Sequence, residues 1–174
     1  MSTSKSNALH VDFCGLSFDS PIVLLSGCVG FGEEYTRVEG FSNRDVGAVV
    51  RKGTTGEARL GNRPHRVCET PMGMINAIGL QNPGVNKVVD EILPGLDFEE
   101  TRFIANVSGS TIDEYVEVTR RFDDSPIDAI EINISCPYVK EGGVQFGNVP
   151  EMSARVVAAC RAETDKPIIT KLSP

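Results

Sequence analysis

The 174-residue chain has no tryptophan, only two histidines and no Cys-x-x-Cys pair. The two histidines, His10 and His65, give little support to a histidine-based metal site or to a Ser/His/Asp triad. The five cysteines, at positions 14, 28, 68, 136 and 160, are odd in number and widely scattered. They indicate neither a disulfide framework nor a zinc site, so we expect reduced thiols and no bound metal.

The chain also lacks an excess of basic residues and a long apolar run. Seventeen Lys plus Arg against twenty-four Asp plus Glu give a net charge of -7, which argues against general binding to nucleic acid or to an anionic membrane. No apolar run is long enough to span a membrane, and the polar opening residues 1–7 lack the apolar core of a secretory signal. We therefore expect a cytoplasmic protein of ordinary globular composition.

Apolar runs rich in β-branched residues alternate with amphipathic stretches and predict repeated strand–helix units. The first element is predicted to be a hairpin over residues 9–18 that turns at Cys14-Gly15. Strands are predicted at 21–25, 48–51, 103–107, 129–134 and 167–172, and helices at 33–41, 85–93, 111–122 and 150–163. The long segment 53–80 is predicted to be a loop, and loops of that length are usually functional.

This alternation predicts an α/β fold with a parallel sheet, either open or closed into a barrel. Polar residues favour the barrel, because barrel enzymes place their chemistry at the carboxyl ends of the strands. The residues at those ends are Lys52, Asn106, Asn133 with Cys136, and Lys171. A complete (β/α)8 TIM barrel takes about 250 residues and eight strands. We therefore predict a single domain over residues 1–174 that forms the five N-terminal strands of a truncated barrel.

Six short motifs follow one another along residues 9–174. They are Ser26-Gly27-Cys28-x-Gly30-Phe31-Gly32, Lys52-Gly53-Thr54-Thr55, Gly61-Asn62-x-Pro64, Asn76-Ala77-Ile78-Gly79-Leu80-Gln81-Asn82-Pro83-Gly84, Asn133-x-Ser135-Cys136-Pro137 and Lys171-Leu172-Ser173-Pro174. In this order they resemble the dihydroorotate dehydrogenase family. The Gly-Cys-x-Gly-Phe-Gly turn, the Asn-Ala-Ile-Gly-Leu block and the stretch 139–143 look most like its NAD-linked class 1B, in the catalytic subunit.

The resemblance implies FMN-dependent oxidation of dihydroorotate to orotate in pyrimidine biosynthesis. In the family a base removes the C5 proton while hydride passes from C6 to the flavin, and Cys136 matches the position of that base. A cysteine with an ordinary pKa of ~8.5 can act as a base at mildly alkaline pH. Without the surrounding motif, burial as a small apolar residue would be the commoner role of a free cysteine.

The resemblance also implies ligand contacts. Those to the substrate fall on Lys52, Asn76, Ala77, Ile78, Gly79, Leu80 and Asn133. Those to the flavin fall on Ser26, Gly27, Lys52, Gly53, Asn106, Asn133 and Lys171. Asparagine suits both ligands because its amide donates and accepts hydrogen bonds, although most asparagines at strand ends only cap loops. For the two lysines, a Schiff base is the competing enzymatic role.

Members of the NAD-linked class pair with an electron-transfer subunit that carries FAD and a [2Fe-2S] cluster. The resemblance implies such a partner, NAD as the final acceptor, and a homo- or hetero-oligomer at full length. One position departs from the family, which usually reads Ser-Cys-Pro-Asn, because this chain has Tyr138 as the fourth residue. Two alternatives therefore stay open: a related flavin barrel that acts on other dihydropyrimidines, and a non-catalytic fragment.

Overall fold

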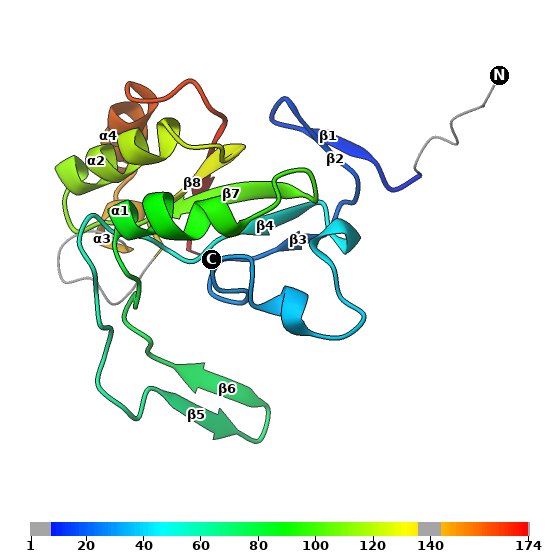
Figure 1. The fold of residues 1–174 in the computed structure, drawn as a ribbon. Coiled ribbons are helices and arrows are strands. Elements are labelled where there is room, and N and C mark those ends of the chain that lie inside the picture. The colour runs from blue at the N-terminus through cyan, green and yellow to red at the C-terminus, as the bar shows by residue number, and fades with distance from the viewer. Residues whose placement is uncertain (1–7, 136–143, 174) are drawn as a thin grey trace.

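The computed structural model describes residues 8–135 and 144–173, and its centre is a sheet of five parallel strands. The strands lie in chain order across the sheet: β3 (Val23–Leu24), β4 (Ala48–Val50), β7 (Arg102–Val107), β8 (Ala129–Asn133) and β9 (Ile168–Lys171). The sheet is curled into a half-barrel (Figure 1). The predicted truncated TIM barrel is thereby confirmed.

Helices cover the outer face of this sheet. They are α1 (Val85–Lys87), α2 (Ile112–Asp123) and α4 (Pro150–Arg161), which Figure 1 draws on one side of β7 and β8. Alternate strand residues point toward them, because successive side chains of a strand face opposite sides. The main apolar core therefore joins strand and helix residues, among them Ala105, Val107, Ile130, Ile132, Tyr115, Val118, Phe122 and Val156.

The inner face is apolar near the amino ends of the strands. Ala48, Val50, Ile104 and Ala129 form a small buried cluster there with Phe18. Phe18 ends the hairpin of β1 (Val11–Phe13) and β2 (Leu16–Phe18), which therefore packs against the amino end of the half-barrel. The predicted hairpin and its turn are confirmed, with Cys14 and Gly15 both at positive φ.

The prediction of a helix at residues 33–41 is wrong. Only one 3-10 turn, η1 (Tyr35–Arg37), forms there, and a second, η2 (Asn43–Asp45), follows. The Glu34 carboxylate accepts hydrogen bonds from the backbone N–H groups of Phe31 and Gly32, which folds the segment back on itself. Tyr35 and Val38 are exposed, so no apolar stripe is buried that would support a longer helix.

The segment 53–80 is not a simple loop, because it contains a second hairpin. This hairpin consists of β5 (Val67–Thr70) and β6 (Gly73–Asn76), and it projects from the rest of the molecule in Figure 1. The strand predicted at 21–25 is shorter than expected and lies at the edge of the sheet, where Val23 is 38% exposed. An edge strand has a neighbour on one side only, which accounts for this exposure.

The helix predicted at 85–93 is present in three pieces. After α1, a π-turn, η3 (Val88–Ile92), and a 3-10 turn, η4 (Leu93–Gly95), complete it. Helix α2 begins after Thr111, whose hydroxyl accepts a hydrogen bond from the Glu114 N–H and so caps the helix. The Glu114 carboxylate accepts from the Ser110 N–H. The short helix α3 (Val144–Gly147) precedes α4.

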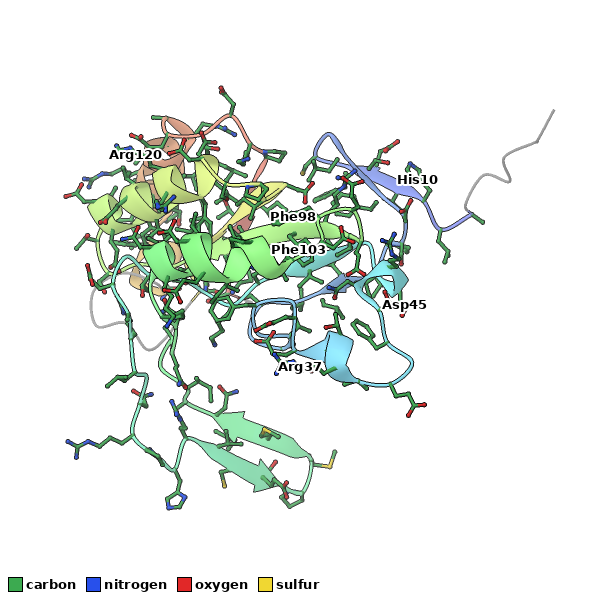
Figure 2. All side chains as sticks on the ribbon, in the orientation of Figure 1. His10, Arg37, Asp45, Phe98, Phe103 and Arg120 are labelled. Carbon is green, nitrogen blue, oxygen red and sulfur yellow. The ribbon has the colours of Figure 1, made fainter. Side chains whose placement is uncertain are left out.

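Aromatic side chains close the core beside β7. Figure 2 labels Phe98 and Phe103, whose rings meet edge-to-face with centroids 5.2 Å apart. Phe103 is completely buried, as expected for a residue on the helix-covered face of β7. Within the described part of the chain, no helix combines the length and apolar character needed to cross a membrane.

Candidate active site

Polar side chains from three neighbouring strands meet on the inner face, at the carboxyl ends of the strands. We call this group the strand-end cluster; its members are Asn106, Ser108, Glu131, Asn133, Ser135 and Lys171. Strand register brings them together, since Asn106 pairs with Glu131 across β7 and β8, and Asn133 pairs with Lys171 across β8 and β9. The structure thus places three predicted site residues, Asn106, Asn133 and Lys171, in one group.

Hydrogen bonds run through the cluster from the lysine to the carboxylate. The Lys171 Nζ donates to Asn133 Oδ1 at 2.9 Å and to Ser135 Oγ at 2.8 Å. The Asn133 Nδ2 lies 3.4 Å from Asn106 Oδ1 and 3.3 Å from Ser108 Oγ. The Asn106 Nδ2 donates to Glu131 Oε1 at 2.5 Å. Two amides therefore bridge a cation and an anion.

Three members of the cluster, Ser108, Glu131 and Ser135, are not among the predicted ligand contacts, and Glu131 is the charged one of the three. Its side chain is buried on the inner face, and burial raises the pKa of its carboxyl, while the hydrogen bond from Asn106 and the charge of Lys171 lower it. A signal was present in the sequence. Glu131 interrupts an apolar strand two residues before Asn133, and residues two apart on a strand share a face.

The backbone around the cluster is held from both sides. On the outer side, the Tyr115 hydroxyl donates to the carbonyl oxygen of Asn133 at 2.7 Å. On the β4 side, the Thr54 N–H donates to the Asn106 carbonyl at 2.9 Å and the Ser108 N–H donates to the Thr54 carbonyl at 2.9 Å. These bonds extend the sheet past its regular strands and set the position of the amides.

Gly53 connects the cluster to the long loop. A Cβ at Gly53 would lie 2.8 Å from Asn106 Oδ1 and 3.3 Å from Leu80 Cδ2, so only glycine allows this approach. Lys52 precedes it, is half-buried, and has its backbone N–H bonded to the Gly30 carbonyl at 2.7 Å. Lys52 also lines a hollow of about 440 Å³ together with Phe31, Arg59 and other residues of the loop.

The loop 76–80 is organised by two asparagines. Asn62 donates from Nδ2 to the Ala77 carbonyl at 2.8 Å and from its backbone N–H to the Ile78 carbonyl at 2.9 Å. Asn82 is buried and donates to the Leu80 carbonyl at 2.7 Å and to Thr55 Oγ1 at 2.9 Å. The loop is therefore tied to the end of β4, with Leu80 beside Gly53 and Asn76 at the base of the second hairpin.

The turn after β3 carries two predicted flavin contacts, Ser26 and Gly27, and lies at the same edge of the sheet. Arg51 supports this turn from beneath. Its Nε donates to the Phe31 carbonyl at 2.9 Å, and its guanidinium lies 5.6 Å from the centre of the Phe31 ring. Burial lowers the pKa of Arg51 to about 10, partly offset by the Glu34 charge. The guanidinium therefore serves to hold the turn rather than to face solvent.

Cys136 and Tyr138 lie outside the described residues. Of the other cysteines, Cys14, Cys28 and Cys68 are exposed, and Cys160 lies on the core-facing side of α4 and is buried.

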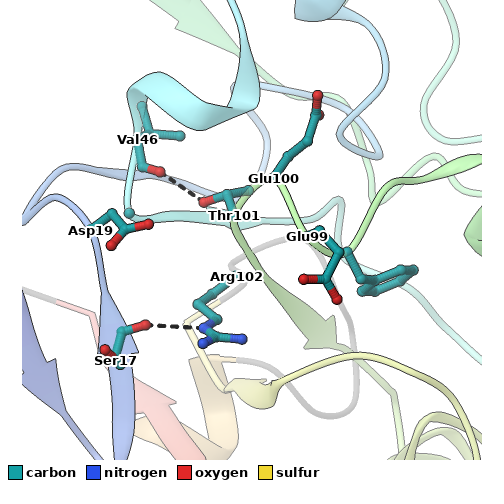
Figure 3. Close-up of a pocket in the computed structure, with 9 residues that line it drawn as sticks. Ser17, Asp19, Val46, Glu99, Glu100, Thr101 and Arg102 are labelled. Carbon is teal, nitrogen blue, oxygen red and sulfur yellow. Dashed lines mark hydrogen bonds between the residues drawn. The ribbon is translucent and has the colours of Figure 1, made fainter. Parts of the chain in front are cut away.

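A separate hollow of about 260 Å³ lies at the amino ends of the strands, opposite the cluster. Figure 3 shows Arg102 bonded to the Ser17 carbonyl and Thr101 bonded to the Val46 carbonyl in its wall. None of the predicted site residues lines this hollow. In barrel folds the carboxyl ends of the strands carry the active site and the amino ends contribute to stability. We therefore assign this hollow to the stabilising end of the half-barrel.

Comparison with known proteins identifies the family of the chain. A family model described as dihydroorotate dehydrogenase matches residues 8–174. The chain is 52% identical over 169 residues to a "Dihydroorotate dehydrogenase B (NAD(+)), catalytic subunit" of Anoxybacillus flavithermus (strain DSM 21510 / WK1), covering 97% of this chain and 54% of that protein. A protein of the same description from Geobacillus sp. (strain WCH70) is 49% identical, with 97% and 53% covered. The chain thus spans about half the length of these relatives.

A solved structure shares the fold. The crystal structure of DHODH in complex with ferulenol from Eimeria tenella superposes with a TM-score of 0.71 at 21% sequence identity. The match covers 91% of this chain and 45% of that one.

Proposed function

The chain belongs to the dihydroorotate dehydrogenase family, and from this premise we propose that it is the N-terminal half of a catalytic subunit that oxidises dihydroorotate to orotate. The observation that carries the proposal is the strand-end cluster, in which two amides and an ammonium group gather at the carboxyl ends of a half-barrel. The reaction belongs to pyrimidine biosynthesis, and we place it in the cytoplasm.

FMN is the cofactor that we propose for this site. The chemistry of the cluster fits it, because an asparagine amide offers a donor beside an acceptor, and the pyrimidine edge of a flavin has the same alternation. Asn106, Asn133 and Lys171 would hold the ring, with Lys52 and the backbone at Ser26, Gly27 and Gly53 beside them. When bound, FMN would supply the acceptor for the hydride that leaves C6 of dihydroorotate.

Cys136 is the base that we propose for the C5 proton. It directly follows Ser135, whose hydroxyl donates to Asn133 Oδ1 at 2.9 Å and accepts from Lys171, so the preceding residue is already held at the cluster. Loss of a proton from C5 and of a hydride from C6 forms the C5–C6 double bond of orotate. An ordinary thiol pKa of ~8.5 suits proton removal at mildly alkaline pH.

The substrate contacts that we propose are Lys52, the loop 76–80 and Asn133. Dihydroorotate carries a carboxylate and ring amides, which an ammonium group and asparagine side chains can pair with. Gly53 brings the end of this loop, at Leu80, close to Asn106, which supports a substrate site beside the proposed flavin contacts.

An electron-transfer subunit is the partner that we propose. The relatives are described as the catalytic subunit of an NAD(+) enzyme, which implies a second subunit in those proteins. For this chain we infer a partner with FAD and a [2Fe-2S] cluster, NAD as the final acceptor, and an oligomer in the complete assembly.

The test compares this chain with a version that carries the rest of its reading frame, extended to the length of the relatives. Each is purified and examined for flavin absorbance and for oxidation of dihydroorotate. We expect flavin and turnover in the extended protein. An extended protein without flavin or turnover would refute the proposal. Flavin together with reduction of another pyrimidine, and no oxidation of dihydroorotate, would favour the alternative substrate that Tyr138 suggests.

Cys136→Ser tests the base. In the extended protein it should slow the oxidation by about 10²–10⁴-fold at neutral pH, the usual contribution of a general base. Cys68→Ser is the matched control, because Cys68 is exposed on the second hairpin. Equal rates for Cys136→Ser and the control would remove Cys136 from this role.

A further inference from the structure

Glu131 is a buried carboxylate on the inner face of β8 that the proposed reaction does not use. Its side chain belongs to a residue only 5% exposed, and it lies in the layer between the apolar end of the half-barrel and the proposed ligand site. A buried carboxylate is costly unless hydrogen bonds and charge satisfy it. Asn106 donates a hydrogen bond to Glu131, and Lys171 supplies a positive charge near it. The proposed function assigns both of these residues to the flavin.

The contact with Asn106 has a direction. An ionised carboxylate only accepts hydrogen bonds, so Asn106 must turn its Nδ2 toward Glu131, and the two atoms lie 2.5 Å apart. The Oδ1 of Asn106 then faces the other way, where Ser108 Oγ lies 3.3 Å from it and Asn133 Nδ2 lies 3.4 Å from it.

The other end of the cluster imposes the same direction. The ammonium group of Lys171 only donates, so Asn133 must turn its Oδ1 toward Lys171 Nζ, at 2.9 Å, and its Nδ2 toward Asn106. The two ends of an amide have nearly the same shape, and steric packing alone distinguishes them poorly. An acceptor-only group at one end and a donor-only group at the other leave one arrangement for both amides.

We propose that Glu131 is a positioning residue that sets the orientation of the Asn106 and Asn133 amides and so determines which of their groups face the bound flavin. The part that concerns the flavin rests on the proposed function; the part that concerns the amides does not. Glu131 acts through Asn106 and touches neither substrate nor cofactor.

Two substitutions separate orientation from charge. Glu131→Gln removes the charge and keeps, at the same side-chain length, an oxygen that can accept from Asn106. The Lys171 end of the cluster still directs the Asn106 Nδ2 toward that oxygen. Glu131→Met keeps the length and removes the acceptor. Glu151→Gln, on the exposed surface at the start of α4, is the control for loss of one carboxylate.

The first measurement uses the 174-residue protein without flavin. The side-chain amide resonances of Asn106 and Asn133 are recorded by ¹⁵N NMR in the wild type and the three variants. We expect Glu131→Gln and Glu151→Gln to leave them near their wild-type positions, and Glu131→Met to shift both. Unchanged Asn106 and Asn133 signals in a folded Glu131→Met protein would overturn the proposal, and so would equal shifts in Glu131→Gln and Glu131→Met.

The second measurement uses the protein extended to the length of its relatives and titrates it with FMN. Glu131→Met should raise the dissociation constant for FMN about tenfold or more, because no side-chain acceptor then orders the contacting amides. Glu131→Gln should restore near wild-type binding. An FMN affinity insensitive to Glu131→Met would overturn the part that concerns the flavin. If the wild type binds no FMN while the amide signals respond as expected, the proposed function fails and the orientation role stands.

Discussion

The Tyr115 hydroxyl in α2 donates a hydrogen bond to the backbone carbonyl oxygen of Asn133 in β8, with 2.7 Å between the oxygens. Tyr115 is fully buried among the core residues, whereas the Asn133 side chain lies on the opposite face of the sheet. One bond therefore links the helix-covered core to the residue at the centre of the candidate site.

Tyr115→Phe tests this link. The change should lower the free energy of unfolding by about 1–3 kcal/mol, because it leaves a buried carbonyl without this donor. The measurement is urea unfolding followed by circular dichroism. Tyr35→Phe provides the control, because Tyr35 is 42% exposed. Equal stability of the two variants would show that the bond contributes nothing.

Gly47→Ala should destabilise the protein where β3 meets β4. A Cβ at Gly47 would lie 1.8 Å from the Ser20 carbonyl oxygen, so the backbone must move. We expect a loss of more than about 2 kcal/mol in thermal or urea unfolding. Gly95→Ala is the matched control, since nothing lies within 4 Å of that Cβ, and it should change stability by less than about 1 kcal/mol. Similar losses in the two variants would contradict the steric reason.

The thiol of Cys160 should resist alkylation in the folded protein. It is completely buried, and burial raises the pKa of the thiol, so little thiolate forms and reagents cannot reach it. Cys14, Cys28 and Cys68 are exposed and should react first. Mass spectrometry of peptides after timed treatment with iodoacetamide measures each rate. Reaction of Cys160 as fast as Cys68 without denaturant would disprove the prediction.

Stability should depend on pH through Glu131. Its folded-state pKa is raised above the ordinary value of 4.5, mainly by burial. A carboxyl with a raised folded pKa binds its proton more tightly when folded, so its stabilising contribution is complete below the ordinary pKa and is lost as the pH rises through the raised value. Glu131→Gln cannot ionise. The wild type should therefore lose stability relative to Glu131→Gln as the pH rises from about 4.5.

Urea unfolding of both proteins at a series of pH values provides the measurement. A wild type that gains stability over Glu131→Gln in this range would reverse the predicted sign. The expected result also has a functional meaning. The ionised carboxylate would cost folding energy at neutral pH while it holds the direction of the two amides, which is the kind of cost that functional sites carry.

The half-barrel could be predicted from the sequence because its signals are local. Apolar runs at 48–51, 103–107 and 129–134 show the strands, and a polar residue after each run shows which edge carries the site. The cap at Thr111 is equally local. Family motifs added the proposed ligand contacts, which periodicity alone does not supply.

What the sequence did not predict depends on tertiary contacts. The helix expected at 33–41 fails because the Glu34 carboxylate is used by the backbone of Phe31 and Gly32, and no core lies beneath Tyr35 and Val38. The role of Glu131 depends on cross-strand register, which places it opposite Asn106. Packing sets the register between two distant strands, and the sequence of one strand alone does not predict it.

The order of the central strands in the sheet is also their order along the chain, from β3 to β9. Each central strand therefore pairs with the central strand before it in the chain. No strand has to be inserted between two strands that are already paired. During synthesis on a ribosome, the sheet could grow by addition at one edge as each strand–helix unit emerges. The half-barrel could thus be assembled in the direction of translation, with the lysine end of the cluster added last.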